Sequence, residues 1–230
     1  MELYPAVDIM GGKVARAQAE LTDPLAAVQA FTRAGARWIH LVDMDRAFGR
    51  GDNLALMTAV LQAATGGVRV QVGGGLAAES DIDRMFTLGA ARVVIGARGA
   101  LDEALVKRLL ARHGPHRVAV GIDAKHGRVA PRGTGEAMDL LARDLAASVA
   151  RLGVRTIVYN DVSRDGMLAG PDVEGGRQLA THGLDVIVSG GVGSLDDLRA
   201  VRAARLAGAC VGRALYDGRF TFAEALACLS

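Results

Sequence analysis

The sequence lacks the features of secreted, membrane-spanning or disulfide-rich proteins. Its 230 residues include only two cysteines, Cys210 and Cys228, which lie in apolar surroundings and match no metal or redox spacing. We therefore interpret both as buried thiols in a reducing cytoplasm. Asp8 interrupts the N-terminal residues before the apolar region of a signal peptide can form. No uninterrupted apolar run approaches the roughly 18 residues of a membrane span. These absences predict a soluble, cytoplasmic protein with no membrane partner.

The chain also has few aromatic residues, and neither positive nor negative charge predominates. Aromatic residues make up 4% of the chain although 50% of it is hydrophobic. The core is therefore expected to consist of Val, Leu, Ile and Ala, as is usual for parallel sheets covered by helices. The formal net charge is only +2, and no basic stripe with interleaved aromatic residues is present, so nucleic-acid binding is not expected. The histidines show no metal-ligand spacing, so no metal site is predicted.

What the sequence does have is an apolar run followed by an amphipathic stretch, repeated eight times. The expected strands are 3–9, 38–42, 68–72, 93–95, 118–122, 156–159, 186–188 and 209–211. The expected helices are 24–34, a helix capped by Asn53 that runs to Gly66, then 80–88, 102–112, 136–152 and 172–181, and two helices opened by capping boxes at Ser194 and Thr221.

These eight units, with no linker or low-complexity segment between them, predict one α/β domain covering residues 1–230. Their number and the chain length favour a closed (β/α)8 TIM barrel over an open doubly wound sheet. An open sheet would be expected to carry a G-x-G-x-x-G turn for a nucleotide, and the glycines at 73–75 do not have that spacing.

Two strands that end in glycine occur once in each half of the chain. Gly191 follows Gly74 at nearly the same separation as Gly212 follows Gly96. The chain thus reads as a twofold repeat of half-barrels, about 1–115 and 116–230. A buried strand that stops on glycine leaves backbone N–H groups uncovered, and these suit an anion. We therefore predict a phosphate cradle in each half.

The carboxylates at the strand ends follow the same repeat. In a TIM barrel the active site lies at the C-terminal strand ends, where Asp8 and Asp123 occupy matched positions across the mouth. Two carboxylates flanking one reacting centre suit general acid–base catalysis of a ligand that carries a phosphate at each end. The alternative is that these aspartates cap loops or pair with Lys13 and Lys125 and that the glycines only form turns. The matched pairs favour the catalytic interpretation.

A second matched pair of aspartates, Asp43 and Asp161, is interpreted differently. Rim hydrogen bonding is preferred for them over direct chemistry, although Asp161 is kept among the candidate ligand-binding residues.

With these residues assembled, the chain resembles the phosphoribosylformimino-aminoimidazole carboxamide ribotide isomerases of histidine biosynthesis, the HisA family. The resemblance extends over nearly the whole sequence. It is carried by segments 5–8, 12–16, 39–45, 47–48, 71–75, 94–96, 121–124, 161–171, 189–192 and 211–216.

The resemblance implies a cofactor-free Amadori rearrangement that converts an aminoaldose ribotide with two phosphates into an aminoketose. Asp8 would be the general base that removes the C2′ proton, and Asp123 the general acid that opens the ribose ring. The enzyme would act as a monomer, with no metal. The residues expected to bind the substrate and its phosphates are Arg16, Gly74, Gly75, Gly96, Asn160, Asp161, Gly166, Ser189, Gly190, Gly191, Gly212 and Arg213.

Because the chain departs from the family pattern at several positions, the resemblance does not decide which substrate it takes. The loop after Arg16 is shorter by roughly ten residues than a lid that excludes water and positions substrate, and Thr134 stands in a shortened loop where the family has tryptophan. Asn160 replaces threonine, Leu76-Ala77 replaces Ile-Arg, and Ala97 replaces Thr or Ser. The chain is therefore a minimal isomerase, an isomerase that also takes the smaller phosphoribosylanthranilate, or a weakly active or non-catalytic phosphosugar-binding relative.

Overall fold

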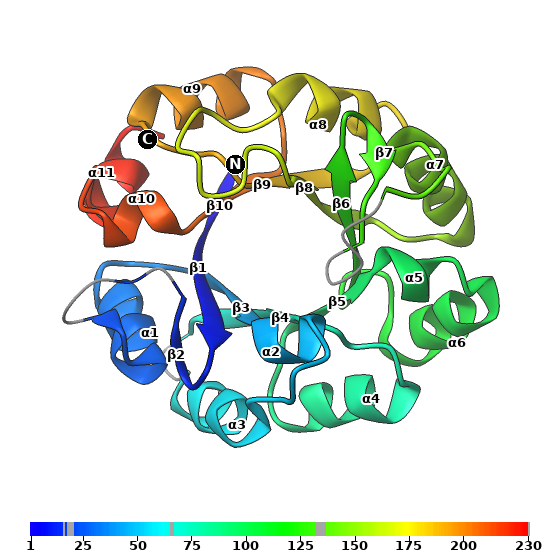
Figure 1. The fold of residues 1–230 in the computed structure, drawn as a ribbon, viewed down its shortest axis with the longest axis horizontal. Coiled ribbons are helices and arrows are strands. Elements are labelled where there is room, and N and C mark those ends of the chain that lie inside the picture. Colours follow the sequence, from blue (N-terminus) through cyan, green and yellow to red (C-terminus); the bar gives the residue numbers. More distant parts are fainter. Residues whose placement is uncertain (16, 18–20, 65–66, 132–136, 230) are drawn as a thin grey trace.

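The computed structural model describes residues 1–15, 17, 21–64, 67–131 and 137–229. Within them, eight parallel strands close into a ring, because the last of these strands pairs with the first. Figure 1 shows this ring face on, with the first half of the chain on one side and the second half on the other. The predicted (β/α)8 TIM barrel is confirmed. In ring order the strands are β1 (Glu2–Met10), β3 (Trp38–Asp43), β4 (Arg69–Gly73), β5 (Arg92–Gly96), β6 (Val118–Lys125), β8 (Thr156–Asp161), β9 (Asp185–Ser189) and β10 (Gly208–Val211).

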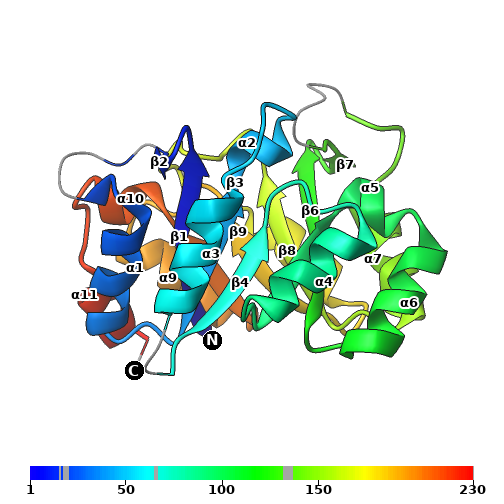
Figure 2. The ribbon, with the colours of Figure 1, turned by 90° about the horizontal axis from the view of Figure 1, so that it is seen from below.

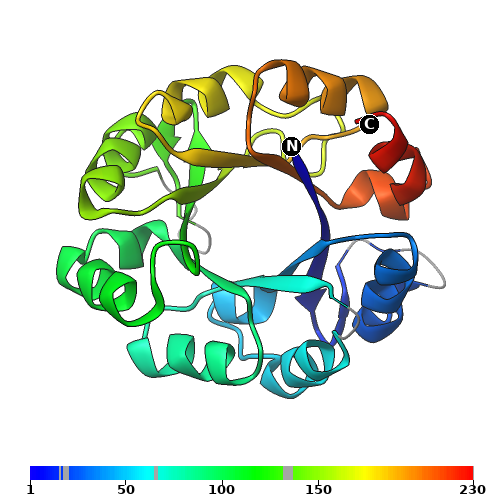
Figure 3. The same ribbon diagram turned by 180° about the vertical axis from the view of Figure 1, so that it is seen from behind.

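Helices surround the ring on its outer side, which is also plain from behind in Figure 3. The helices that cover the strands are α1 (Pro24–Arg33), α3 (Leu54–Ala63), α4 (Glu79–Thr87), α6 (Glu103–His113), α7 (Ala142–Leu152), α8 (Val173–Ala180), α9 (Leu195–Ala203) and α11 (Phe222–Ala227). The capping boxes predicted at Ser194 and Thr221 open α9 and α11 with both reciprocal hydrogen bonds. None of the helices in the described ranges is both long enough and apolar enough to cross a membrane.

Short elements follow several strands directly and were not predicted. They are the one-turn helices α2 (Met44–Ala47), α5 (Ala97–Ala100) and α10 (Arg213–Tyr216), and the two-residue strands β2 (Lys13–Val14) and β7 (Arg128–Val129). β2 forms an antiparallel hairpin with β1, and β7 forms one with β6. Figure 2 shows β2, α2 and β7 at the end to which the strand arrows point, and both termini at the opposite end.

The helix expected over 136–152 is shorter than predicted. It begins at Ala142, because the residues before it run alongside the hairpin of β6 and β7. The backbone N–H of Met138 donates to the carbonyl of Val129 at 2.7 Å, and Leu141 forms an isolated antiparallel bridge with Arg128. These bonds hold the segment extended, so it cannot adopt helical dihedrals.

The predicted cap of α3 is also wrong in part. Asn53 stands at the cap position, but its side chain makes no capping hydrogen bond. The carboxylate of Asp52 accepts from the backbone N–H of Leu54 at 3.0 Å instead. The Asn53 amide donates to Asp43 and Asp45, each at 2.8 Å, and so links α3 to the end of β3.

Two apolar clusters stabilise the barrel. The larger one fills the space between strands and helices, where Val7, Ile39, Ile95 and Ile157 are fully buried. The smaller one comprises Tyr4, Trp38, Val94, Ala119, Val158, Ile187 and Cys210, all of them on barrel strands. Of the two thiols predicted to be buried, Cys210 is buried and Cys228 is only half-buried.

Candidate active site

A cavity of about 520 Å³ opens at the C-terminal ends of the barrel strands. All eight barrel strands contribute residues to its lining, so the cavity is the mouth of the barrel. Of the predicted site residues, those that line it are Asp8, Gly74, Gly75, Gly96, Asp123, Asn160, Gly166, Ser189, Gly190, Gly191, Gly212 and Arg213. Arg16 lies outside the described residues, as do Thr134 and residues 18–20 of the shortened loop after Arg16.

The two carboxylates selected from the repeat face one common cavity. Asp8 stands near the end of β1 and Asp123 near the end of β6. In the ring, three strands separate β1 from β6 on either side, so the two strands lie opposite each other (Figure 1). Strand pairs β4–β5 and β9–β10, which carry the glycines, are opposed in the same way. The middle of a bound molecule would therefore lie between the carboxylates, with its ends at the two glycine sets.

Asp123 is held by its neighbour on the next strand. The backbone register pairs Asp123 with Asn160, and the Asn160 side-chain N–H donates to the Asp123 carboxylate at 2.7 Å. Asn160 is 3% exposed, and its buried side-chain oxygen has no hydrogen-bond partner among the described residues. Reversing the amide would place that oxygen against the carboxylate, so Asn160 must present its N–H to Asp123. The amide thereby fixes where the Asp123 carboxylate lies in the cavity.

A third carboxylate that the sequence reasoning did not select also lines the cavity. Asp165 lies in the loop after β8, within the segment 161–171 that carries the family resemblance. The repeat selected Asp8 and Asp123, but the position matched to Asp165 in the first half falls at Ala47, which has no titratable group. Only the family resemblance of segment 161–171 could therefore have identified Asp165 from the sequence.

The glycines around the cavity serve two different purposes. Gly74 has φ +102° and Gly191 φ +86°, and a Cβ on either residue would overlap a backbone carbonyl oxygen, that of Asp43 or of Gly170. At these two matched positions the chain path itself requires glycine. Gly96 has an ordinary negative φ, and a Cβ there would meet no atom within 4 Å. Its missing side chain leaves the backbone open to the cavity.

Among the described residues, the arginines that line the cavity are Arg46, Arg98 and Arg213. The Arg213 guanidinium donates to the carbonyl oxygen of Gly166 at 2.7 Å and to the Asp217 carboxylate at 3.0 Å. It therefore ties α10 to the loop that carries Gly166 and Asp165. Arg46, on α2 directly after β3, lies next to Gly75.

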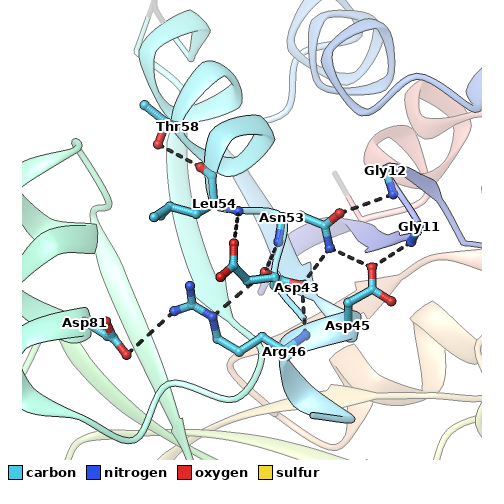
Figure 4. A network of polar contacts seen from close by, with 10 residues as sticks. Gly11, Gly12, Asp43, Asp45, Arg46, Asn53, Leu54, Thr58 and Asp81 are labelled. Atoms are coloured by element: carbon cyan, nitrogen blue, oxygen red, sulfur yellow. Dashed lines mark hydrogen bonds and ion pairs between the residues drawn. The ribbon is translucent and has the colours of Figure 1, made fainter. Parts of the chain in front are cut away.

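The second matched pair of aspartates organises the rim. The Asp161 carboxylate accepts from the backbone N–H and the hydroxyl of Ser163, at 3.0 and 2.6 Å, and does not line the cavity. Asp43 accepts from the backbone N–H of Arg46 and from the backbone N–H and the side-chain amide of Asn53 (Figure 4). This geometry agrees with the rim hydrogen bonding preferred for this pair, and it gives no support to Asp161 as a ligand-binding residue.

A buried polar chain below the cavity fixes the tautomer of His40, another lining residue. The Arg92 guanidinium donates to the Gln71 side-chain oxygen at 3.0 Å, and arginine has no acceptor. The Gln71 amide nitrogen therefore faces the Nδ1 atom of His40, 2.9 Å away, and donates to it. Nδ1 carries no proton, so the imidazole is neutral with its proton on Nε2.

Tyr216, on α10, borders the cavity near Asp8. Its hydroxyl donates to the carbonyl oxygen of Ala6 at 2.8 Å. Burial, and then the nearby Asp8 carboxylate, raise the pKa of Tyr216 far above its usual value. Tyr216 therefore keeps its proton at neutral pH.

The chain is similar to known proteins over nearly its whole length. A family described as "Histidine biosynthesis protein" matches residues 2–221. A protein from Symbiobacterium thermophilum is 44% identical, with 98% of this chain and 96% of the relative covered. One from Dinoroseobacter shibae is 45% identical with both chains covered completely, and one from Shouchella clausii is 43% identical over 98% of this chain and 97% of the relative. All three are named 1-(5-phosphoribosyl)-5-((5-phosphoribosylamino)methylideneamino) imidazole-4-carboxamide isomerase.

The alignment with the Dinoroseobacter shibae protein spans 242 positions although this chain has 230 residues. The relative therefore carries residues that this chain lacks, as the shortened loops predict.

Proposed function

The chain belongs to the histidine biosynthesis protein family, and from this premise we propose that it is the aldose–ketose isomerase that its relatives are named for. The observation that carries the proposal is the shared cavity, in which Asp8 and Asp123 come from opposite strands of one barrel. Its volume of about 520 Å³ lies within the range of small-molecule sites.

The shape of the site supports a ligand with two phosphate groups. The relatives' name contains two phosphoribosyl groups, and the cavity has two opposed sets of glycines. Gly74, Gly75 and Gly96 form the N-terminal cradle, and Gly190, Gly191 and Gly212 form the C-terminal cradle. Ser189 and Arg213 add polar side chains to the C-terminal cradle, which makes it the stronger of the two.

The proposed mechanism moves one proton at each side of the reacting sugar. Asp123 gives a proton to the ribose ring oxygen, the bond between C1′ and that oxygen breaks, and the nitrogen lone pair forms a C1′–N double bond. Asp8 then takes the C2′ proton, and the electrons left behind form a C1′–C2′ double bond and restore the nitrogen lone pair. The Asp123 carboxylate then takes the proton of the C2′ hydroxyl while Asp8 gives its proton to C1′, which completes the aminoketose and returns both carboxyl groups to their starting states. Acid–base catalysis of this kind contributes about 10²–10⁴-fold per group.

The test is steady-state turnover of the aminoaldose ribotide by the purified protein. Formation of the aminoketose supports the proposal, and no turnover at high enzyme concentration rejects it in favour of a phosphosugar-binding role. Calorimetry with the same ribotide then shows whether binding survives without catalysis.

The N-terminal cradle supports a second activity, on phosphoribosylanthranilate. Leu76, Ala77 and Ala97 line the cavity beside this cradle and offer no polar side-chain atoms. A ligand with a single phosphate would use the C-terminal cradle and need little from the other. Complementation of a tryptophan-auxotroph strain separates a dual isomerase from one confined to histidine biosynthesis.

We also propose that the chain acts as a single barrel domain of two half-barrels, in the cytoplasm, and as a monomer. Its cavity is lined by residues from all eight strand ends of one chain, so no partner chain is needed to complete it. The hairpins of β1 with β2 and of β6 with β7 occupy matched places in the two halves. Light scattering coupled to gel filtration tests the monomer.

A further inference from the structure

The N-terminal cradle has few polar side chains of its own. Among the described residues that line the cavity from 73 to 77 and from 96 to 99, only Arg98 has a charged side chain. Arg98 stands on α5 and is exposed. A phosphate bound at Gly74 and Gly75 would need a cation from another part of the barrel.

Arg46 is the arginine placed to supply that charge. It belongs to α2, directly after β3, and its side chain packs over the cradle: a Cβ on Gly75 would lie 2.9 Å from Cγ of Arg46. The Arg46 side chain is 17% exposed and lines the cavity. Figure 4 shows it reaching from the end of β3 toward α4.

The ion pairs of Arg46 are long. Its guanidinium lies 3.9 Å from the Asp43 carboxylate and 4.0 Å from the Asp81 carboxylate on α4, whereas a direct charge-assisted hydrogen bond is about 2.7–2.9 Å. Asp43 already accepts hydrogen bonds from the backbone of Arg46 and from Asn53. These pairs orient the guanidinium without making short hydrogen bonds to it, so a phosphate dianion can bind it more strongly.

The second half of the chain provides a direct comparison. Arg164 follows Asp161 by three residues, as Arg46 follows Asp43, and its Nε atom lies 3.3 Å from that carboxylate. The guanidinium of Arg164 also donates to the carbonyl oxygen of Gly170 at 3.2 Å, and Arg164 does not line the cavity. The C-terminal cradle receives its cation from Arg213 instead. Matched arginines thus have different surroundings in the two halves. Arg164 packs behind Gly191, where a Cβ on the glycine would lie 3.2 Å from the Cβ of Arg164, but of the two arginines Arg46 is the one that lines the cavity.

We propose that Arg46 binds the phosphate group held by the N-terminal cradle, releasing Asp81 as it does so. This inference rests on the proposed two-phosphate ligand but concerns a residue to which neither the sequence pattern nor the family resemblance assigns a role. A planar guanidinium suits this task because it can donate two parallel hydrogen bonds to phosphate oxygens.

The first test needs no catalysis. Crystals of the wild-type protein, of Arg46→Gln and of Arg164→Gln are soaked in sulfate at one concentration. We expect an anion at both cradles in the wild type, loss of the N-terminal anion alone in Arg46→Gln, and retention of that anion in Arg164→Gln. An N-terminal anion of full occupancy in Arg46→Gln overturns the inference. Because the readout is anion occupancy, it stands whether or not the protein turns over the ribotide.

The second test distinguishes binding from a structural role by the sign of the effect. We expect Arg46→Gln to raise the KM for the aminoaldose ribotide by about 10- to 100-fold, the effect of losing a hydrogen bond between charged groups. Asp81→Asn removes the competing carboxylate, so we expect it to lower KM by about twofold. If the ion pair with Asp81 only holds the loop in place, both variants raise KM together, and that result contradicts the inference. Melting temperatures of both variants confirm that each is folded.

Discussion

Asp123, the proposed general acid, shares its cavity with a second carboxylate of the same half of the chain, Asp165. Both line the cavity, and Asp123 is positioned by the Asn160 amide at 2.7 Å. We expect Asp123→Asn to lower turnover of the aminoaldose ribotide by about 10³-fold, because one acid–base group is lost. The melting temperature should barely change, since Asn is nearly isosteric with Asp. The measurement is kcat with a melting curve for each variant.

Asp165→Asn is the matched control for this expectation. If that substitution abolishes turnover while Asp123→Asn keeps a nearly normal rate, Asp123 leaves the mechanism and the loop carboxylate takes its place.

Asn160 provides a finer test at the same site. Its amide donates to Asp123, at a position where the family resemblance leads us to expect threonine, whose hydroxyl can also donate. We expect Asn160→Thr to keep most of kcat and Asn160→Val to lose about tenfold, the cost of one hydrogen bond to a charged group. Comparing kcat for the two variants of similar size isolates the donor. Equal rates would show that the hydrogen bond does not position Asp123 for catalysis.

For single residues of the site, the sequence could predict those that recur at matched positions in the two halves and those that belong to the segments resembling the family. Asp8 and Asp123 stood out because each has a partner in the other half, and both line the cavity. Arg46, His40 and Asp165 were missed. The residue matched to Arg46 is Arg164, whose side chain donates to the carbonyl oxygen of Gly170 instead. The tautomer of His40 depends on Gln71 and Arg92, which come from β4 and β5. Such contacts between distant residues leave no local pattern in the sequence.

Among the secondary-structure elements, the hairpin of β1 and β2 depends on a tie to the barrel rim. The backbone N–H of Gly11 donates to the Asp45 carboxylate at 2.6 Å, and that of Gly12 to the Asn53 side chain at 3.2 Å (Figure 4). The hydrogen bond from the Asn53 amide, and then that from Gly11, lower the pKa of Asp45 below its usual value. A carboxyl group whose pKa is lowered on folding stabilises the fold above its unfolded pKa.

This tie should therefore weaken in acid. As pH falls through the lowered pKa of Asp45, its carboxylate is protonated and the bonds to Gly11 and Asn53 weaken. We expect protection of the Gly11 amide against hydrogen exchange, corrected for the intrinsic pH effect, to fall by about tenfold over this range. In Asp45→Ala the protection should already be low and independent of pH. Equal protection in the wild type and Asp45→Ala at neutral pH would contradict this account of the hairpin.

The long elements of the fold could be predicted because their patterns are local. All eight barrel strands and the helices that cover them appear near the expected residues, and both predicted capping boxes form. Elements of two to four residues, such as β2, β7 and α2, are too short for a hydrophobic pattern to repeat within them, so the sequence could not reveal them. The late start of α7 follows from pairing with β7, a contact that only the folded hairpin creates.

Across the whole molecule, burial of the three tyrosines makes the fold sensitive to alkali. Burial raises the pKa of Tyr4, and it raises those of Tyr159 and Tyr216 further, helped by Asp172 and Asp8 respectively. An unfolded tyrosine ionises near pH 10. Since each folded pKa is higher, this contribution to stability is complete below that pH and is lost as pH rises above it.

We therefore expect no phenolate absorbance from the native protein near pH 10, and a single cooperative rise when alkali unfolds it. Ultraviolet absorbance and circular dichroism recorded on the same samples check this. A gradual rise in phenolate absorbance with an unchanged circular dichroism spectrum would show that the tyrosines titrate in the folded state.

The closed barrel followed from the number of repeating units, and the opposition of Asp8 to Asp123 followed from the strand order that closure imposes. What the sequence could not supply was the size of the mouth or the side chains that reach into it from the rim. Those depend on how loops pack over eight strands at once.

We propose that Asp8 and Asp123 act as base and acid on one sugar bound in this cavity. The most direct measurement follows conversion of the aminoaldose ribotide by the purified wild-type protein, with Asp8→Asn run alongside at the same concentration. We expect the wild type to form the aminoketose and Asp8→Asn to be slower by about 10³-fold or more, with an unchanged melting temperature. No conversion by the wild type, or equal rates for the two proteins, would contradict the claim.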